Sequence, residues 1–289
     1  MPTVKQKLTH QYCDSEYSKL LKVLVCKPEY MEISTIINET QKHYLDENID
    51  RKLAAKQHEN FIQALQKHGA EVMNIQPAEE FPEQVFTRDI GFTVGDTTYV
   101  SKMESKIRQG EEHLLKEWLR ERGFRSHPIG AGSIEGGDIL IDRNFIYAGH
   151  SGRTTKAAIE RLRSLLPQYD IAVIPFNKKY LHLDCVFNIL SPDEALVFPP
   201  ALKKKELEFL ASRYRLIEVN EQEQFTMGTN VLSIGNKKLF SLPQNKEVNA
   251  KLRSRGYEVI EVDISEIIKS GGAFRCCTMP IERERGPSQ

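Results

Sequence analysis

The sequence predicts an α/β fold built from five repeats, each with two strands, a helix and a further short strand. The first observation is a nearly constant interval between five polar residues, whose positions differ successively by 46, 49, 46 and 46. These residues are Asp89, Glu135, Asp184, Asn230 and Cys276. The second observation is that five segments share one pattern of helix, breaker and strand. A period that appears in both polar positions and backbone patterns is structural.

The repeated segments each contain a helical stretch that ends at a glycine or a polar residue, followed by a run of β-branched or apolar residues. The copies are LQKHGAEVMNI from Leu65, LRERGFRSHPI from Leu119, LPQYDIAVIPF from Leu166, LASRYRLIEVN from Leu210 and LRSRGYEVIEV from Leu252. An open array of such units would leave an apolar strand edge unpaired, so we expect a closed ring. In a ring the first polar residue of each equivalent strand points toward the axis. The five polar residues then share one pocket.

The elements of the first repeat follow from local patterns. Residues 1–20 are predicted to be a polar leader, and LLKVLVC, from residue 20, is predicted to be a buried strand that ends before Pro28. A helix is expected from about Glu47 to His68, and a strand over residues 71–75. The apolar face of that helix is predicted to consist of Leu53, Phe61, Ile62 and Leu65.

The other repeats begin with pairs of strands joined by tight turns. The turns are predicted at Gly95-Asp96, at Asp142-Arg143-Asn144, at Ser191-Pro192-Asp193 and at Gly235-Asn236. No linker interrupts the repeats, so residues 1–289 are expected to form a single domain.

The composition narrows the class of partner. The chain has 289 residues, 40% of them hydrophobic, and its 40 basic and 40 acidic side chains cancel. This balance gives no electrostatic footprint for nucleic acid or for an anionic membrane, so a small molecule is the expected partner.

The N-terminus has no apolar stretch of signal-peptide length, and no segment approaches about 18 consecutive apolar residues. A soluble, cytoplasmic protein is expected. Its five cysteines lack the spacing of a zinc site and are predicted to be reduced.

The predicted pocket combines several reactive groups. Asp89, Glu135 and Asp184 supply carboxylates, Cys276 supplies a thiol, and His182 lies two residues before Asp184, on the same face of a strand. Buried carboxylates are costly unless they are paired, so three of them without a metal framework indicate a cationic ligand. A planar guanidinium with several donors suits carboxylates best.

The thiol and the imidazole indicate nucleophilic catalysis. Cys276 can attack if a cationic neighbour or a bound cationic substrate populates its thiolate. His182 can act first as a general acid toward a leaving amine and then as a general base toward water, while Glu135 orients its ring. These roles describe attack on a guanidinium carbon. Because the neighbours of Cys276 are acids, its thiol is expected to stay protonated until substrate binds.

Five motifs, in their order along the chain, resemble the guanidine-modifying enzyme superfamily, whose members include arginine deiminases, agmatine deiminases, dimethylarginine dimethylaminohydrolases and amidinotransferases. The motifs are FTRD (residues 86–89), IEGGD (134–138), HSGRT (150–154), LHLD (181–184) and GGAFRCCTMP (271–280). The resemblance covers nearly the whole chain, and it implies a five-bladed α/β propeller of the pentein type. It also implies covalent catalysis through an S-alkylthiouronium intermediate, without a metal or an organic cofactor.

The resemblance further implies a role for each motif residue. Cys276 looks like the nucleophile, His182 like the acid and base, and Glu135 like the carboxylate that contacts both histidine and guanidinium. Asp89 and Asp184 resemble the residues that grip guanidinium nitrogens in this superfamily. Arg153 is similar to an arginine that binds a substrate carboxylate in arginine deiminases.

Within the superfamily the sequence leaves three functions open. The leading one is a hydrolase that acts on arginine, a methylated arginine or a related small guanidino compound; Asp184 matches the deiminases and amidinotransferases, whereas the chain length is close to that of the dimethylarginine hydrolases. An amidinotransferase would use the same residues with an amine in place of water. The pentein architecture also occurs as a non-catalytic ribosome-binding factor. A homodimer is a reasonable expectation for such an enzyme.

Overall fold

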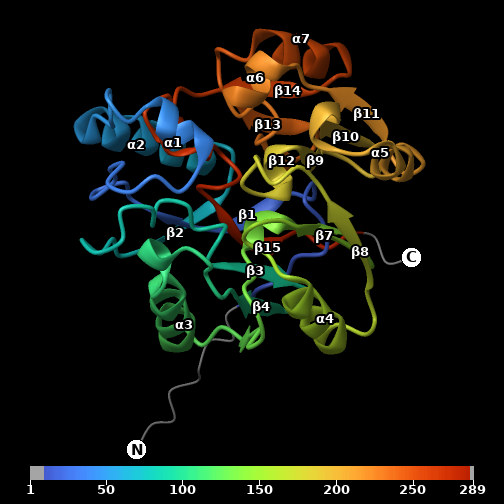
Figure 1. Ribbon diagram of the computed structural model, residues 1–289, viewed down its shortest axis with the longest axis horizontal. Helices are drawn as coiled ribbons and strands as arrows, with labels where there is room; N and C mark the ends of the chain where they lie inside the picture. Colours follow the sequence, from blue (N-terminus) through green and yellow to red (C-terminus); the bar gives the residue numbers. More distant parts are fainter. Residues whose placement is uncertain (1–9, 287–289) are drawn as a thin grey trace, which may run out of the picture.

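The computed structural model describes residues 10–286, in which five three-stranded sheets surround a common centre (Figure 1). Most helices lie toward the outside, and the strands form the inner part of the molecule (Figure 1). This arrangement confirms the predicted α/β fold of five repeats. The described residues contain no helix that is long and apolar enough to cross a membrane.

Four of the sheets are each formed by one continuous repeat. In each, the first two strands are antiparallel, and the third strand returns through a helix to pair in parallel with the second. The first two repeats are β3 (Gly91–Val94), β4 (Thr97–Val100), α3 (Glu111–Glu121) and β5 (Ser126–Pro128), then β6 (Ile139–Asp142), β7 (Phe145–His150), α4 (Lys156–Leu165) and β8 (Asp170–Pro175). The next two are β9 (Phe187–Ile189), β10 (Glu194–Val197), α5 (Lys204–Ala211) and β11 (Arg215–Glu218), then β12 (Leu232–Gly235), β13 (Lys238–Ser241), α7 (Lys246–Ser254) and β14 (Glu258–Glu261).

The fifth sheet joins the two ends of the chain. Its first strand is β15 (Met279–Arg283), which pairs antiparallel with β1 (Leu20–Cys26). The chain then continues through α1 (Glu39–His43) and α2 (Arg51–Lys67) to β2 (Glu71–Ile75), which is parallel to β1. This sheet therefore has the same strand arrangement as the others, but its strands come from both termini.

Contacts link each sheet to the next around the centre. Strand β15 packs against β3, β6 against β9, and β1 against β12. The sheets of β4 and β6 are joined by a bridge between Lys102 and Ile134. Asn188 of β9 donates to the carbonyl oxygens of Thr229 and Val231, just before β12. Five hydrophobic clusters fill the space within and between these layers in the described part of the chain.

The turns and helix ends show why the residue types recur. Gly69, Gly123 and Gly256 adopt left-handed φ angles of 89°, 71° and 81°, and each ends a helix shortly before a strand. Only glycine takes up this conformation without a steric penalty. The strand pairs turn where the sequence predicted; in the last of them Asn236 and Lys237 have φ angles of 53° and 56°.

Helix α2 differs from its prediction in two respects. It begins at Arg51, because the side chain of Asp50 accepts hydrogen bonds from the first free N–H groups, so the expected start near Glu47 was too early. Leu53, predicted on the apolar face, is 41% exposed. The buried stripe includes Ala54 and Phe61, which are seven residues apart, and Leu53 lies one position away from that spacing.

Part of the predicted leader is integrated into the body of the protein. Its residues 1–9 lie outside the described residues, but Cys13 forms a bridge with Gly95 and Ser15 forms one with Asp142. The side chain of Glu16 is buried. The segment before β1 therefore spans several sheets, which its polar composition did not indicate.

Candidate active site

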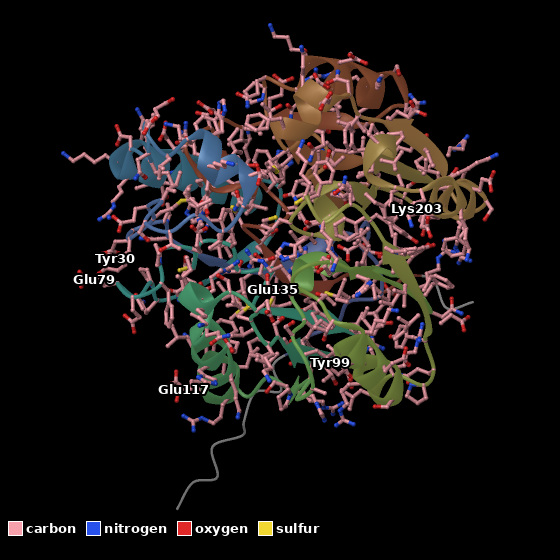
Figure 2. The ribbon with its side chains drawn as sticks, viewed as in Figure 1. Tyr30, Glu79, Tyr99, Glu117, Glu135 and Lys203 are labelled. Atoms are coloured by element: carbon pink, nitrogen blue, oxygen red, sulfur yellow. The ribbon has the colours of Figure 1, made fainter. Side chains whose placement is uncertain are left out.

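The five recurring polar residues all lie in turns directly before the first strand of a sheet. Asp89 precedes β3, Glu135 precedes β6, Asp184 precedes β9, Asn230 precedes β12 and Cys276 precedes β15. The prediction that these residues are part of the strands was wrong, although the interval between them was structural as expected. Figure 2 shows Glu135 near the middle of the molecule.

His182 lies between two of the carboxylates. Its Nε2 is 2.7 Å from Glu135 Oε2, and its Nδ1 is 3.5 Å from Asp89 Oδ1. All three side chains are buried. A 3₁₀ turn over Leu183–Cys185 directly follows His182. This turn, and not a shared face of a strand as predicted, brings His182 and Asp184 into the same site.

The two carboxylates keep a proton on His182. Burial alone lowers the pKa of an imidazole, but the charge of Asp89 and the hydrogen bond with Glu135 raise the pKa of His182 to about 9. For Glu135, burial acts to raise the pKa, but the hydrogen bond and charge of His182, with Arg153, hold that pKa below its usual value. At neutral pH the site therefore contains an imidazolium that can donate a proton.

Cys276 is buried and is held by Asn230. The side-chain Nδ2 of Asn230 donates to Sγ at 3.2 Å, and its Oδ1 accepts from the backbone N–H of Cys276 at 3.2 Å. Asp184 Oδ2 lies 3.8 Å from Sγ. The repeat interval had singled out Asn230 without giving it a role, and these two hydrogen bonds orient the thiol.

The surroundings of Cys276 favour the thiol over the thiolate. Burial raises the pKa of Cys276 well above its ordinary value, and the charge of Asp184 raises it further. Burial also raises the pKa of Asp184, against the opposing effects of Arg275 and His182. A cation placed between Asp184 and Sγ would favour ionisation of both groups. These pKa directions support the expectation that the thiol stays protonated until a cationic substrate is bound.

Each of the three carboxylates already has an arginine partner. Arg108 Nη1 is 2.6 Å from Asp89 Oδ2, Arg153 Nη1 is 3.4 Å from Glu135 Oε2, and Arg275 Nε is 3.2 Å from Asp184 Oδ2. The premise that these carboxylates are unpaired was therefore wrong. Arg153 was predicted to bind substrate, but none of these three pairings was predicted, because ring closure, and not local sequence, decides which arginine meets which carboxylate.

Asp89 nevertheless keeps one oxygen available. Arg108 binds Oδ2 and pairs also with Glu111, whereas within residues 10–286 Asp89 Oδ1 and His182 Nδ1 have no hydrogen-bond partner. Buried polar atoms without partners are costly, so such atoms are suited to bind a ligand. The free carboxylate oxygen matches a guanidinium N–H.

Arg153, predicted to bind a substrate carboxylate, makes two contacts within the protein. Besides pairing with Glu135, its Nη2 donates to the carbonyl oxygen of Ile37 at 3.0 Å. Only 8% of the residue is exposed. Arg153 also lines a cavity beside Asn38 and Tyr180. In this structure Arg153 orients Glu135 and anchors the segment before α1.

Two glycines of the motifs are required by close packing. A Cβ atom at Gly137 would lie 2.7 Å from the His182 ring and 3.0 Å from Asp89 Oδ1. A Cβ atom at Gly272 would lie 2.5 Å from the Phe86 ring and 2.9 Å from the Cys276 Cβ. Any side chain at either position would displace a candidate catalytic residue.

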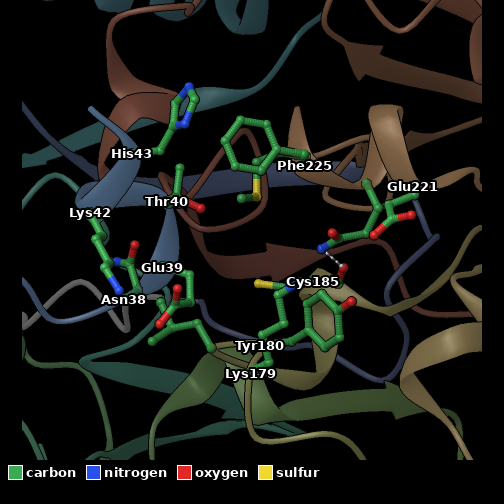
Figure 3. Close-up of a pocket in the computed structure, with 14 residues that line it drawn as sticks. Asn38, Glu39, Thr40, Lys42, His43, Lys179, Tyr180, Cys185, Glu221 and Phe225 are labelled. Atoms are coloured by element: carbon green, nitrogen blue, oxygen red, sulfur yellow. Dashed lines mark hydrogen bonds between the residues drawn. The ribbon is translucent and has the colours of Figure 1, made fainter. Parts of the chain in front are cut away.

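A cavity of about 350 Å³ lies beneath α1, and Cys185 is among the residues that line it. Figure 3 shows His43 and Phe225 on one side of this cavity and Tyr180 and Cys185 on the other. Cys185 lies 3.6 Å from Asp184 Oδ1, so the floor of the cavity is one residue away from the carboxylate that contacts Cys276. Residues of α1 therefore line a cavity that reaches Cys185, next to Asp184.

A buried carboxylate fastens α1 to the loop before the nucleophile. Gln41 Nε2 donates to Glu83 Oε1 at 2.6 Å, and Ser270 Oγ lies 2.8 Å from the same oxygen. Burial raises the pKa of Glu83 to about 7, although Arg108 opposes the shift. The hydrogen bonds from Ser270 and Gln41 partly offset the effect of burial on this pKa and link α1 to the loop before Cys276.

Glu83→Gln is expected to alter the pH dependence of stability. The folded pKa of about 7 exceeds the ordinary value of 4.5, so the contribution of Glu83 is full below 4.5 and is lost as pH rises through about 7. A neutral glutamine avoids that loss, which reaches about 3 kcal/mol. Thermal melts across this pH range should show that the melting temperature of the variant rises relative to that of the wild type as pH rises. For the control Glu80→Gln, at an exposed residue, the curve of melting temperature against pH should be parallel to that of the wild type. A parallel curve for Glu83→Gln would contradict the raised pKa of Glu83.

Asp89, Glu135 and His182 have the donor atoms of a possible metal site, since one ligand atom from each lies within 4.8 Å of the others. The charges argue against this use. Arg108 already pairs with Asp89, Arg153 pairs with Glu135, and His182 carries a proton at neutral pH. A metal ion would have to displace that proton and oppose two arginines.

A family model described as N,N dimethylarginine dimethylhydrolase, eukaryotic, matches residues 27–283. Among individual proteins, the chain is 51% identical over 271 residues to the uncharacterized protein YkgA of Bacillus subtilis, covering 94% of this chain and 95% of that one. It is 28% identical to the N(G),N(G)-dimethylarginine dimethylaminohydrolase of Mycobacterium tuberculosis, covering 81% and 77%.

Among solved structures, the chain is similar to the substrate-bound N-terminal domain of ArgZ, an arginine dihydrolase from the ornithine-ammonia cycle in cyanobacteria. The TM-score is 0.83 at 25% sequence identity, and the match covers 91% of this chain and 98% of that one. The arrangement of five sheets is therefore shared with a protein that acts on a guanidino amino acid.

Proposed function

Because this chain belongs to the N,N-dimethylarginine dimethylhydrolase family, within the guanidine-modifying superfamily, we propose that it hydrolyses a guanidino C–N bond of arginine, a methylated arginine or a related small compound. We further propose that residues 1–289 act as one catalytic domain, with Cys276 as the nucleophile. The observation that carries the proposal is the meeting, in one buried site, of an Asn230-held thiol with an imidazolium paired to Glu135.

Substrate binding prepares the nucleophile. A guanidinium that donates to Asp89 Oδ1 and to Asp184 brings a positive charge next to Cys276 Sγ, which favours loss of the thiol proton to solvent. The thiolate attacks the guanidinium carbon and forms a C–S bond. His182 then gives its proton to the departing nitrogen, and the C–N bond breaks to release an amine or ammonia. An S-alkylthiouronium on Cys276 and a neutral His182 remain.

Water completes the reaction. Neutral His182 takes a proton from the attacking water as the C–O bond forms, and Glu135 stabilises the imidazolium that results. The C–S bond breaks, the ureido product leaves, and the second water proton passes to the Cys276 thiolate. His182 and Cys276 then have their starting protonation states. No further group is needed to balance these steps.

The direct test is mass spectrometry of the intact protein after rapid acid quench with arginine, dimethylarginine, agmatine and guanidino acids, together with assays of ureido product and released amine. A substrate-dependent adduct at Cys276 with matching ureido product is expected. The compound that is turned over identifies the substrate. No adduct and no product across the panel would contradict the proposed hydrolase.

An amidinotransferase is the second candidate, because an amine could replace water at the thiouronium stage without a change of residues. Repeating the assay with and without glycine or ornithine separates the two reactions. Transfer would require the amine and yield a new guanidino product, whereas hydrolysis proceeds without it. The family match favours hydrolysis, and it also disfavours a non-catalytic binding role.

Asp184→Asn is expected to weaken binding of a guanidino ligand by about ten- to a hundredfold, because a charge-assisted hydrogen bond is lost. The melting temperature should change little, since Arg275 keeps Glu16 as a partner. Calorimetry in a Cys276→Ser background measures affinity without turnover. Asp193→Asn, in the exposed turn before β10, is the matched control. Unaltered affinity would remove Asp184 from the binding site.

A further inference from the structure

Glu16 lies in the segment before β1, but its carboxylate reaches the last motif of the chain. Oε2 pairs with Arg275 Nη1 and lies 3.8 Å from Arg88 Nη1, and Oε1 accepts from the backbone N–H of Ile141 at 3.1 Å. The residue is 5% exposed. No step of the proposed reaction uses this buried charge.

Arg275 connects Glu16 to the candidate nucleophile. Its Nε lies 3.2 Å from Asp184 Oδ2, and its Nη2 donates to the carbonyl oxygen of Ile139 at 2.8 Å. The same Asp184 oxygen lies 3.8 Å from Cys276 Sγ. One guanidinium is thus shared by two carboxylates, of which one contacts the thiol.

We propose that Glu16 is a positioning residue for the proposed nucleophile: by pairing with Arg275 it divides the charge of that guanidinium between two carboxylates and leaves Asp184 available to Cys276 and to the substrate cation. The inference rests on the role of Cys276 in the proposed function. It gives the N-terminal segment a part in setting the reactivity of a residue about 260 positions later in the chain.

The surrounding charges set the direction of the effect. Besides burial, four groups raise the pKa of Cys276 through their charge: Asp184, Cys185, Asp89 and Cys277. Arg275 also interacts with Cys276, because the charge of Cys276 raises the pKa of Arg275. Those that act on Glu16 or are acted on by it are Arg275, Arg88, Arg283 and Cys13. Without the charge of Glu16, Arg275 pairs with Asp184 alone. The positive charge of Arg275 that Glu16 no longer offsets then favours the Cys276 thiolate and opposes the binding of a cation.

Glu16→Gln tests this arrangement, because glutamine keeps the size of the side chain and an acceptor for Ile141 but removes the charge. The readout is the pH dependence of Cys276 alkylation by iodoacetamide without substrate, quantified by peptide mass spectrometry with Cys276→Ser as the blank. We expect the midpoint to fall by about one pH unit, which is about a tenfold faster reaction below the midpoint. KM for a guanidino substrate should rise more than kcat changes.

Glu194→Gln is the matched control. Glu194 is also buried and lies 3.6 Å from an arginine, Arg255, but it belongs to β10 and not to the segment before β1. Its alkylation midpoint should equal that of the wild type. In an Arg275→Gln background the additional effect of Glu16→Gln should vanish, because the charge acts through Arg275.

Two results would overturn the proposal: a Glu16→Gln protein that melts like the wild type with an unchanged midpoint, or a shift that persists without Arg275. If Glu16→Gln does not fold, Glu16→Asp replaces it, because the shorter side chain moves the charge away from Arg275 by one methylene. This variant should lower the alkylation midpoint by a smaller amount, and an unchanged midpoint would again overturn the proposal. Because alkylation needs no substrate, these outcomes are independent of whether guanidino hydrolysis is the reaction.

Discussion

Cys276→Ser is expected to lower turnover of the guanidino substrate by roughly 10⁴-fold or more, and to abolish the covalent adduct. A serine hydroxyl has a far higher pKa than a thiol, and Asp184, whose Oδ2 lies 3.8 Å from the Cys276 Sγ, disfavours ionisation at this position. Substrate affinity should persist, because Asp89 and Asp184 are unchanged. Steady-state kinetics measures the turnover, and acid-quench mass spectrometry of the same preparation measures the adduct.

Cys277→Ala is the control for this substitution. Cys277 belongs to a hydrophobic core cluster beside the nucleophile in sequence, so its loss should affect stability and leave the adduct at Cys276. A Cys276→Ser protein that still turns over substrate, or an adduct on a different residue, would exclude the assigned nucleophile.

His182→Gln is expected to lower kcat by about 10³-fold, within the range found for loss of a general acid and base. The wild-type enzyme should lose kcat as pH rises through the pKa of His182, which is about 9 in the free site and lower once a second cation is bound. The variant should lack this alkaline decline, because it has no proton there to lose. Profiles of kcat against pH for both proteins provide the measurement.

His58→Gln is the matched control, since His58 is equally buried but lies on α2, where burial lowers its pKa to about 4. Its kcat profile should follow that of the wild type. An alkaline decline that survives in His182→Gln would assign that proton to another group. A variant with nearly full activity would remove His182 from the reaction.

The repeat interval was the strongest guide that the sequence contained. It selected five positions that all lie just before the first strand of a sheet, and it included Asn230, whose contacts with Cys276 were not foreseen. It could not tell a strand from the turn that precedes it, because both give the same period. The misplacement of Leu53 has a similar cause, since helix patterns fix the buried face only to within about one position.

The ion pairs could not be predicted from the sequence. Arg108 follows Asp89 by 19 residues, whereas Glu16 and Arg275 are 259 residues apart. Such pairings depend on which turns meet after five sheets have assembled, and a single sequence contains no local signal for them. The sequence therefore indicated the reactive groups but not the arginines that neutralise them.

The pairing of β15 with β1 has a consequence for how the protein is made. Cys276 lies three residues before β15, and Arg88, from the first third of the chain, donates its backbone N–H to the carbonyl oxygen of Cys276. During translation β1 and β2 leave the ribosome long before β15, the strand that completes their sheet, and long before Cys276. Contacts between distant segments form slowly, so we expect the pairing of β15 with β1, and with it the placement of Cys276, late in folding. A chain that terminates before Cys276 therefore lacks both this thiol and β15, the strand that pairs antiparallel with β1.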